Sequence, residues 1–145
     1  MRVYLDNCCY NRPYDDQSQV KINVESLAKL EIQQQIRENK LELVTSYILE
    51  AENASNPFTS KRNDIQAFID KYTAVYVSAK ADAAVRQIAK EIMKTGVRLM
   101  DGCHIACALV AECDVFLSTD KRLLHYQTDK MRIMNPTAFI IEQEV

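Results

Sequence analysis

The sequence predicts an α/β domain with a mostly parallel sheet and helices on both faces. Short apolar segments alternate along the chain with longer amphipathic ones, and there are only two Gly and three Pro. Strands that alternate with helices need crossover connections, which give a parallel sheet in a three-layer α/β/α arrangement. The 145 residues match one domain. We therefore expect a single domain over residues 1–145 with four to five central strands.

Five short apolar segments are predicted to be strands. The first stops at Asp6, and the last is ended by Asn135 and Pro136. Each is only three to five residues long, which fits a strand buried on both faces better than a helix. The predicted strands are residues 3–5, 41–45, 74–77, 115–117 and 131–134.

Helical periodicity marks the segments between these strands. In residues 16–38 the apolar positions Val20, Val24, Leu27 and Leu30 follow one another at spacings of 4, 3 and 3, which places them on one helix face. Residues 101–112 are apolar on nearly all sides and predict a buried helix. The other predicted helices are residues 47–53, 60–72 and 81–92, the last ending near Gly96, with a helical turn over residues 121–125.

Charge and cysteine content narrow the functional classes. The chain carries 18 basic and 20 acidic residues, a net charge of −2, so it does not bind nucleic acid by bulk charge. No apolar run approaches the ~20 residues of a membrane helix. The N-terminus reaches Asp6 too soon for a signal peptide, and the five cysteines are an odd number. We expect free thiols and a reducing cytoplasm.

Acidic residues recur where a parallel sheet would gather them. Function in such sheets lies at the carboxyl ends of the strands. Asp6 follows the first strand, Asp120 follows the fourth, and Asp101 opens the buried helix. Glu50 and Glu52 lie on the helix after the second strand. Taken singly, each Asp could be a helix cap and each Glu a solvated surface residue.

The combination of these acids points to metal chemistry. Carboxylates at several strand ends of one small sheet repel one another unless a cation lies between them. Their oxygens are the ligands that Mg²⁺ and Mn²⁺ prefer. Such a cation lowers the pKa of bound water and stabilises a leaving oxygen, which suits phosphodiester hydrolysis.

The same residues resemble the PIN domain family over essentially the whole chain. The resemblance rests on the first strand ending in Asp6, on Ser46-Tyr47-Ile48-Leu49-Glu50-Ala51-Glu52-Asn53, on Asp101-Gly102-Cys103-His104-Ile105-Ala106-Cys107-Ala108, and on Phe116-Leu117-Ser118-Thr119-Asp120-Lys121-Arg122-Leu123. It implies a PIN-like fold and a ribonuclease that uses Mg²⁺ or Mn²⁺. It also implies an acidic site of Asp6, Asp101 and Asp120, similar to the toxins of bacterial toxin–antitoxin systems.

The family spacing selects the fourth acid and suggests partners. A Glu six residues after Ser46 is Glu52, with Glu50 as the alternative, because the two lie roughly 200° apart on a helix. The resemblance implies single-stranded or structured RNA as substrate, an antitoxin protein as partner, and a homodimer. The family often has a hydroxyl residue after the first Asp, whereas this chain has Asn7, whose amide can still hydrogen-bond a water or phosphate.

Other side chains are candidates for contacting RNA. The predicted substrate-binding set is Asn7, Arg12, Thr119, Lys121 and Arg122, and Lys61 and Arg62 could extend a basic rim. Tyr10 and Tyr14 could stack on unpaired bases, or be buried or face a partner protein.

Other residues carry competing interpretations. His104 is either a base or ligand, or a packed histidine that holds the Asp101 turn. His125 could contact RNA or simply lie on the surface. A zinc site built from the cysteines is a minor alternative, because they occupy strand-end and buried-helix positions.

Two alternative functions remain open on the sequence. A PIN-like module could bind RNA or protein without cutting. A small metal-dependent phosphatase could use a similar sheet. The chain has no glycine-rich phosphate loop, no His-Glu-x-x-His motif and no Gly-x-Ser-x-Gly motif, which sets aside other common chemistries.

Overall fold

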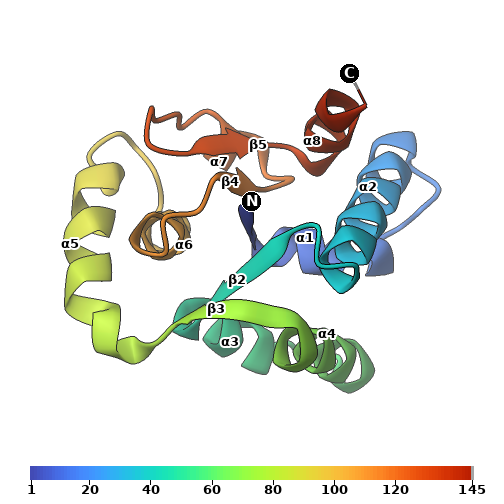
Figure 1. Ribbon diagram of the computed structural model, residues 1–145, viewed down its shortest axis with the longest axis horizontal. Helices are drawn as coiled ribbons and strands as arrows, with labels where there is room; N and C mark the ends of the chain where they lie inside the picture. Colours follow the sequence, from blue (N-terminus) through green and yellow to red (C-terminus); the bar gives the residue numbers. More distant parts are fainter. Residues whose placement is uncertain (145) are drawn as a thin grey trace.

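The computed structural model describes residues 1–144 and contains a five-stranded sheet in which every paired strand is parallel. The strand order is β3-β2-β1-β4-β5 (Figure 1). This confirms the predicted α/β class. The sheet has five strands, the higher of the two numbers predicted. The strands are β1 (Arg2–Leu5), β2 (Glu42–Ser46), β3 (Thr73–Val77), β4 (Val115–Leu117) and β5 (Arg132–Met134).

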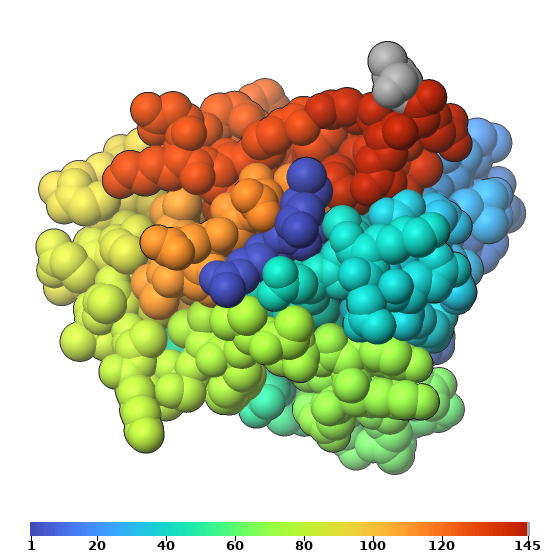
Figure 2. Space-filling view, viewed as in Figure 1, coloured from blue at the N-terminus to red at the C-terminus, as the bar shows by residue number. Residues whose placement is uncertain are grey.

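Strand β1 lies at the centre of the sheet and is buried on both faces. Val3 and Leu5 face one core, and Tyr4 between them faces the other, as the alternation of a strand requires. Because β1 pairs with both β2 and β4, the carboxyl ends of these three strands lie side by side. Figure 2 shows the opposite edge, where the first residues of the chain lie at the surface between the starts of β2 and β4.

Helices cover both faces of the sheet. One layer contains α5 (Asp82–Met93) and α6 (Leu99–Val110), which pack around Tyr4, Val44 and Phe116. The other contains α2 (Val20–Arg37), α4 (Thr59–Tyr72) and α8 (Pro136–Gln143), as Figure 1 shows. The shorter elements are α1 (Asn7–Asn11), α3 (Tyr47–Ala54), α7 (Lys121–Leu124), and the 3-10 turns η1 (Arg12–Tyr14) and η2 (Ala79–Ala81).

Two helices were not predicted, and each has a cap that could have indicated it. Asp6 accepts a hydrogen bond from the Asn7 amide and begins α1. Asn135 accepts from the Thr137 amide, and Pro136 occupies the first turn of α8, which is where proline is favoured. The prediction took Asn135 and Pro136 only as the end of a strand. A helix N-terminus was the better interpretation of this pair.

The apolar face of α2 lies on the outside of the protein. Val20, Val24, Leu27 and Leu30 share a face, as predicted, but all four side chains are exposed, Leu27 at 60%. The face that packs on the core instead contains Ile32 and Ile36 together with the buried polar residues Glu25, Lys29 and Gln33. Burial of Glu25 is possible because Arg12 and Asn135 bind its carboxylate.

This arrangement predicts a small effect for one substitution on α2 and a large effect for another. Leu27→Glu is expected to change the free energy of unfolding by less than about 0.5 kcal/mol, because the side chain is already in water. Ile32→Ala is expected to cost about 2–5 kcal/mol, because Ile32 is fully buried and a cavity remains. Urea denaturation of both variants measures this. A larger loss for Leu27→Glu would mean that the exposed face is buried in the protein as it exists in solution.

The cysteines form no disulfide among the described residues. All five cysteines are free thiols, as expected, and Cys9, Cys103, Cys107 and Cys113 are buried. No helix within residues 1–144 has the length and apolar character needed to cross a membrane.

Candidate acidic site at the carboxyl edge of the sheet

Asp6 connects the ends of two neighbouring strands. Its backbone amide donates to the carbonyl of Leu117, the last residue of β4. One carboxylate oxygen accepts from the Asn7 amide at 2.8 Å, and the other accepts from the Ser118 hydroxyl at 2.9 Å and the Cys8 thiol at 3.3 Å. The carboxylate is therefore buried and fixed in orientation at the centre of the carboxyl edge.

Glu52 reaches the same region from α3 through a buried histidine. One oxygen of Glu52 binds His104 Nε2, and the other accepts from the Asn7 side-chain amide at 3.3 Å. His104 Nδ1 lies 2.6 Å from the Tyr4 hydroxyl, which lies 2.7 Å from the Ser46 hydroxyl. Two strands, β1 and β2, and two helices, α3 and α6, thus share one continuous series of hydrogen bonds. His104 is the packed histidine of the two alternatives, although its partners are Glu52 and Tyr4 rather than the Asp101 turn.

Asp101 and Asp120 complete the acidic group. Asp101 is half-buried in the first turn of α6, where Arg98 and not Asp101 is the N-cap. Burial, then the charge of Asp6, then that of Asp120 raise the pKa of Asp101, against smaller opposite effects of His104 and Arg98. Asp120 caps α7 by accepting from the Arg122 amide at 2.9 Å. Asp6 and Asp120 are therefore close enough to Asp101 to disfavour its charged form.

The two glutamates of α3 lie in different surroundings. Glu50 lies near Tyr76 of β3, since burial and then the charge of Glu50 raise the pKa of that tyrosine. Glu52 faces Asn7 and His104. The structure thus brings Asp6, Glu52, Asp101 and Asp120 to one edge of the sheet and places Glu50 away from them.

The donor set suits a hard divalent cation in chemistry. Four carboxylates from four segments supply only oxygen ligands, and after burial the charges of Asp6 and Asp120 are the next causes of the raised pKa of Asp101. Within residues 1–144, no three His, Cys, Asp or Glu side chains lie close enough together to hold a metal ion as they stand. The cysteines therefore form no zinc site among these residues. Asp6, Glu52 and Asp120 are instead engaged in hydrogen bonds with the protein.

The predicted RNA-contacting residues divide into two groups. Asn7, Lys121 and Arg122 lie beside the acids, and the last two are exposed. Arg12 is paired with Glu25 and Asp15, and Thr119 is buried with its backbone amide donating to Cys8 Sγ, so both residues are already engaged within the protein. Tyr10 is fully buried and cannot stack on a base, whereas Tyr14 is half-exposed. Lys61 lies over the rings of Tyr14 and Phe58, and Arg62 donates to the Asn56 carbonyl.

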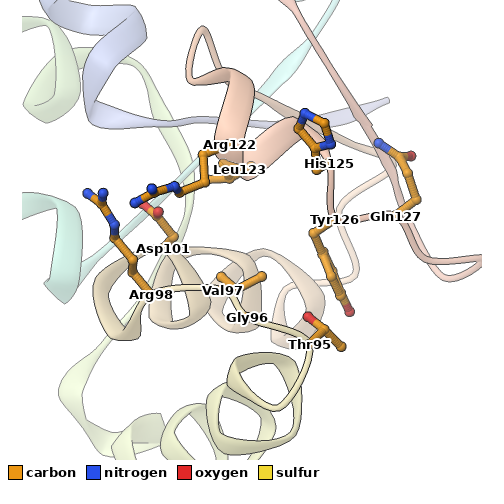
Figure 3. Close-up of a pocket in the computed structure, with 10 residues that line it drawn as sticks. All are labelled: Thr95, Gly96, Val97, Arg98, Asp101, Arg122, Leu123, His125, Tyr126 and Gln127. Carbon is orange, nitrogen blue, oxygen red and sulfur yellow. The ribbon is translucent and has the colours of Figure 1, made fainter.

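A pocket of about 660 Å³ opens next to Asp101 (Figure 3). Its walls come from the loop between α5 and α6 and from α7 with the loop that follows it. The sequence indicated Arg122 and His125 as possible RNA contacts but not the pocket, because the pocket forms where two segments more than 20 residues apart come together. The lining residues are Thr95, Gly96, Val97, Arg98, Asp101, Arg122, Leu123, His125, Tyr126 and Gln127.

The hydrogen bonds of His104 predict a pH dependence of stability. Burial lowers the pKa of His104, but the hydrogen bond to Glu52 and the charges of Asp6, Glu52 and Asp101 outweigh it, so the folded-state pKa lies above 6.5. Above pH 6.5 the unfolded chain loses this proton first, and stability falls as pH rises through the folded pKa. The slope is at most about 1.4 kcal/mol per pH unit.

Denaturation in EDTA between pH 6 and 7.5 measures this slope. The pH range stops at 7.5 because burial lowers the pKa of Lys29 to about 8. Above that pH, the titration of Lys29 would raise stability as pH rises and so oppose the effect of His104. His125 is the one other histidine of the chain and is exposed, so His125→Gln is the matched control and retains the slope. His104→Gln removes it. An identical slope in both variants would contradict the assignment.

Comparisons with known proteins support the fold. No family model matches the sequence, and no curated protein matches it. The structure is similar to that of VapBC2 from Rickettsia felis bound to a DNA fragment from their promoter, with a TM-score of 0.52, 13% identity, and coverage of 93% of this chain and 98% of that one. It is also similar to FitAcB from Neisseria gonorrhoeae, with a TM-score of 0.56, 16% identity, and coverage of 92% and 97%.

At such identities the likeness establishes the fold alone. The three-layer α/β architecture with an all-parallel five-stranded sheet is the PIN-like fold expected from the sequence.

Proposed function

We propose that this chain is a divalent-metal-dependent endoribonuclease that cuts single-stranded RNA, acting as the toxin of a toxin–antitoxin pair. The observation that carries the proposal is the placement of Asp6 and Asp120 beside Asp101, where their charges add to the effect of burial in raising its pKa. A cation bound between these acids would offset the repulsion on Asp101. The likeness in fold to two toxin–antitoxin complexes supports the cellular role.

The proposed chemistry assigns a task to each part of the site. Asp6, Glu52, Asp101 and Asp120 would hold Mg²⁺ or Mn²⁺. When bound, such a cation makes a water nucleophilic at neutral pH and stabilises developing negative charge. The hydrogen bonds from Ser118 and His104 hold Asp6 and Glu52 in fixed orientations. Arg122 and Lys121 would hold the phosphate backbone of the RNA beside the acids.

Cleavage of defined RNAs tests the proposal. A labelled single-stranded RNA and its duplex are incubated with the purified chain in Mg²⁺, in Mn²⁺ and in EDTA, and p-nitrophenyl phosphate is assayed in parallel. We expect internal cuts in the single strand, only with metal. Hydrolysis of the monoester with the RNA intact would favour the phosphatase, and no hydrolysis of either substrate would contradict the proposal.

One observation favours the non-cutting module as a second candidate. Asp6 and Asp120 cap helices, and Glu52 is the partner of His104, so three of the four acids have structural tasks. A module of this kind would bind RNA without turnover in any metal. The cleavage assay combined with an RNA-binding measurement on the same preparation separates the two functions.

Metal binding at the acids predicts a change in thermal stability. A cation that binds only the folded state at a hundredfold excess over its Kd adds about 2.7 kcal/mol, which raises the Tm by about 5–10 °C for a domain of this size. We expect this rise with millimolar Mn²⁺ in the native chain and its loss in Asp101→Asn. Glu50→Gln, which changes an acid outside the site, retains it. An unchanged Tm in the native chain would contradict a metal site in the free protein.

The proposal includes protein partners. An antitoxin would cover apolar surface, and the exposed face of α2, formed by Val20, Val24, Leu27 and Leu30, is the surface we assign to it. Hydrogen exchange with a candidate antitoxin tests this, because protection is expected over residues 20–30. The homodimer is tested by light scattering, which should give twice the 16.6 kDa of the chain.

A further inference from the structure

The pocket beside Asp101 is large for a phosphate and suits a nucleotide. Its volume of about 660 Å³ lies in the range of pockets that enclose small organic ligands. Figure 3 shows Asp101, Arg98 and Arg122 together at one end, with Tyr126, His125 and Gln127 at the other. The pocket therefore has a charged end next to the acidic site and an aromatic end away from it.

The charged end holds two arginines, Arg98 and Arg122, next to Asp101, whose pKa the charge of Arg98 lowers. The other six of the eight arginines have partners. Arg37 lies over aromatic rings, and Arg62 donates to a backbone carbonyl. The remaining four pair with carboxylates: Arg2, Arg12, Arg86 and Arg132. Among the described residues, the guanidinium groups of Arg98 and Arg122 make neither a salt bridge nor a hydrogen bond. Both line this pocket and are exposed. In a chain with net charge −2, such free cations are suited to bind a phosphate.

The far end of the pocket is suited to a base. Tyr126 is half-buried, and its ring forms a wall together with Val97 and the buried Leu123 (Figure 3). The Gln127 side chain donates to the carbonyls of Leu124 and Ile133, which fixes the loop that carries Tyr126. An aromatic wall on a fixed loop can stack on any nucleobase, since every base has a π face.

We propose that this pocket binds one unpaired nucleotide of the RNA strand, with its phosphate on Arg98 and Arg122 and its base against Tyr126. The inference rests on the proposed function, because it places that nucleotide next to the phosphate that the acidic site would cut. A base inside a duplex cannot enter the pocket without leaving its stack. The pocket therefore makes the enzyme select single-stranded RNA.

The first test uses mononucleotides in EDTA, where no cleavage occurs. Amide NMR spectra are recorded during titration with 5′-AMP and, separately, with ribose 5-phosphate. We expect 5′-AMP to shift amides within residues 95–98 and 122–127, and ribose 5-phosphate to shift those near Arg98 and Arg122 more weakly. Equal effects of the two ligands would overturn the assignment of a base to Tyr126. Shifts confined to other residues would overturn the pocket itself.

The second test measures the Kd of a ten-nucleotide single-stranded RNA by fluorescence anisotropy in EDTA. Tyr126→Ala is expected to raise the Kd about 5- to 150-fold, the cost of losing one base stack, and Tyr126→Phe by less than twofold. Tyr76→Ala, which removes a half-exposed tyrosine of β3, is the matched control and leaves the Kd unchanged. Circular dichroism establishes that Tyr126→Ala is folded. An unchanged Kd in Tyr126→Ala overturns the inference.

The two proposals fail in different ways. If the RNA binds through Tyr126 but is never cut in Mg²⁺ or Mn²⁺, the nuclease proposal fails and the nucleotide pocket stands as part of a binding module. If the RNA is cut at the same rate by wild type and Tyr126→Ala, the nuclease stands and the pocket fails. Binding of 5′-AMP as tight as that of the ten-nucleotide RNA would assign the pocket to a free nucleotide, which also overturns the inference.

Discussion

Asp101→Asn is expected to lower the rate of RNA cleavage about 10²- to 10⁴-fold while the protein remains folded. Burial raises the pKa of Asp101 most, and the charges of Asp6 and Asp120 raise it further, so Asp101 is the acid whose charge the other two affect. Asparagine keeps the shape but removes the negative charge that would hold the cation. Loss of several kcal/mol of metal-assisted stabilisation of the transition state corresponds to this factor, since each 1.36 kcal/mol is tenfold in rate.

The matched control for this substitution is Glu50→Gln. Glu50 lies two residues from Glu52 on the same helix but next to Tyr76, outside the acidic site. The Glu50→Gln substitution should leave the cleavage rate within twofold of wild type. RNA affinity of Asp101→Asn, measured in EDTA, should be equal to wild type or higher, because one repulsive charge is gone. A cleavage rate for Asp101→Asn within twofold of wild type would show that Asp101 takes no part in turnover.

The sheet and the positions of the acids could be predicted because they depend on local patterns. A three-residue apolar run such as Val115–Leu117 has few alternatives to a buried strand. In a parallel sheet the residue after each strand must lie at the carboxyl edge, which brings Asp6 and Asp120 to the same side. The spacing of Glu52 from Ser46, which distinguished it from Glu50, agrees with the way the two side chains diverge in the structure.

What could not be predicted depends on contacts between distant segments. The apolar stripe of α2 indicates a helix but not which face meets the core, and the core side tolerates Glu25 because Arg12 and Asn135 satisfy its charge. The pairing of His104 with Glu52 joins residues 52 positions apart. The nucleotide pocket forms where two segments more than 20 residues apart come together, and its arginines are recognised only once the partners of the others are known.

Removing the His104 side chain, which interrupts the buried series of hydrogen bonds from Ser46 to Glu52, is expected to have the largest effect on stability. His104 is 1% exposed, and its ring connects the Tyr4 hydroxyl to the Glu52 carboxylate. His104→Ala leaves a cavity and removes a partner from two polar groups, and one of them, Tyr4, is fully buried. We expect a loss of about 3–5 kcal/mol in the free energy of unfolding.

Urea denaturation with graded variants tests this series of hydrogen bonds even if His104→Ala does not fold. Tyr4→Phe removes only the hydroxyl and should cost about 1–3 kcal/mol. His125→Ala, in the exposed histidine, should cost less than about 0.5 kcal/mol. If His104→Ala and Tyr4→Phe each lowered the free energy of unfolding as little as His125→Ala, the series of hydrogen bonds from Ser46 through Tyr4 and His104 to Glu52 would not exist in solution. In that case Glu52 would be free to turn fully toward the other acids, and the cleavage rate of His104→Ala would equal that of wild type.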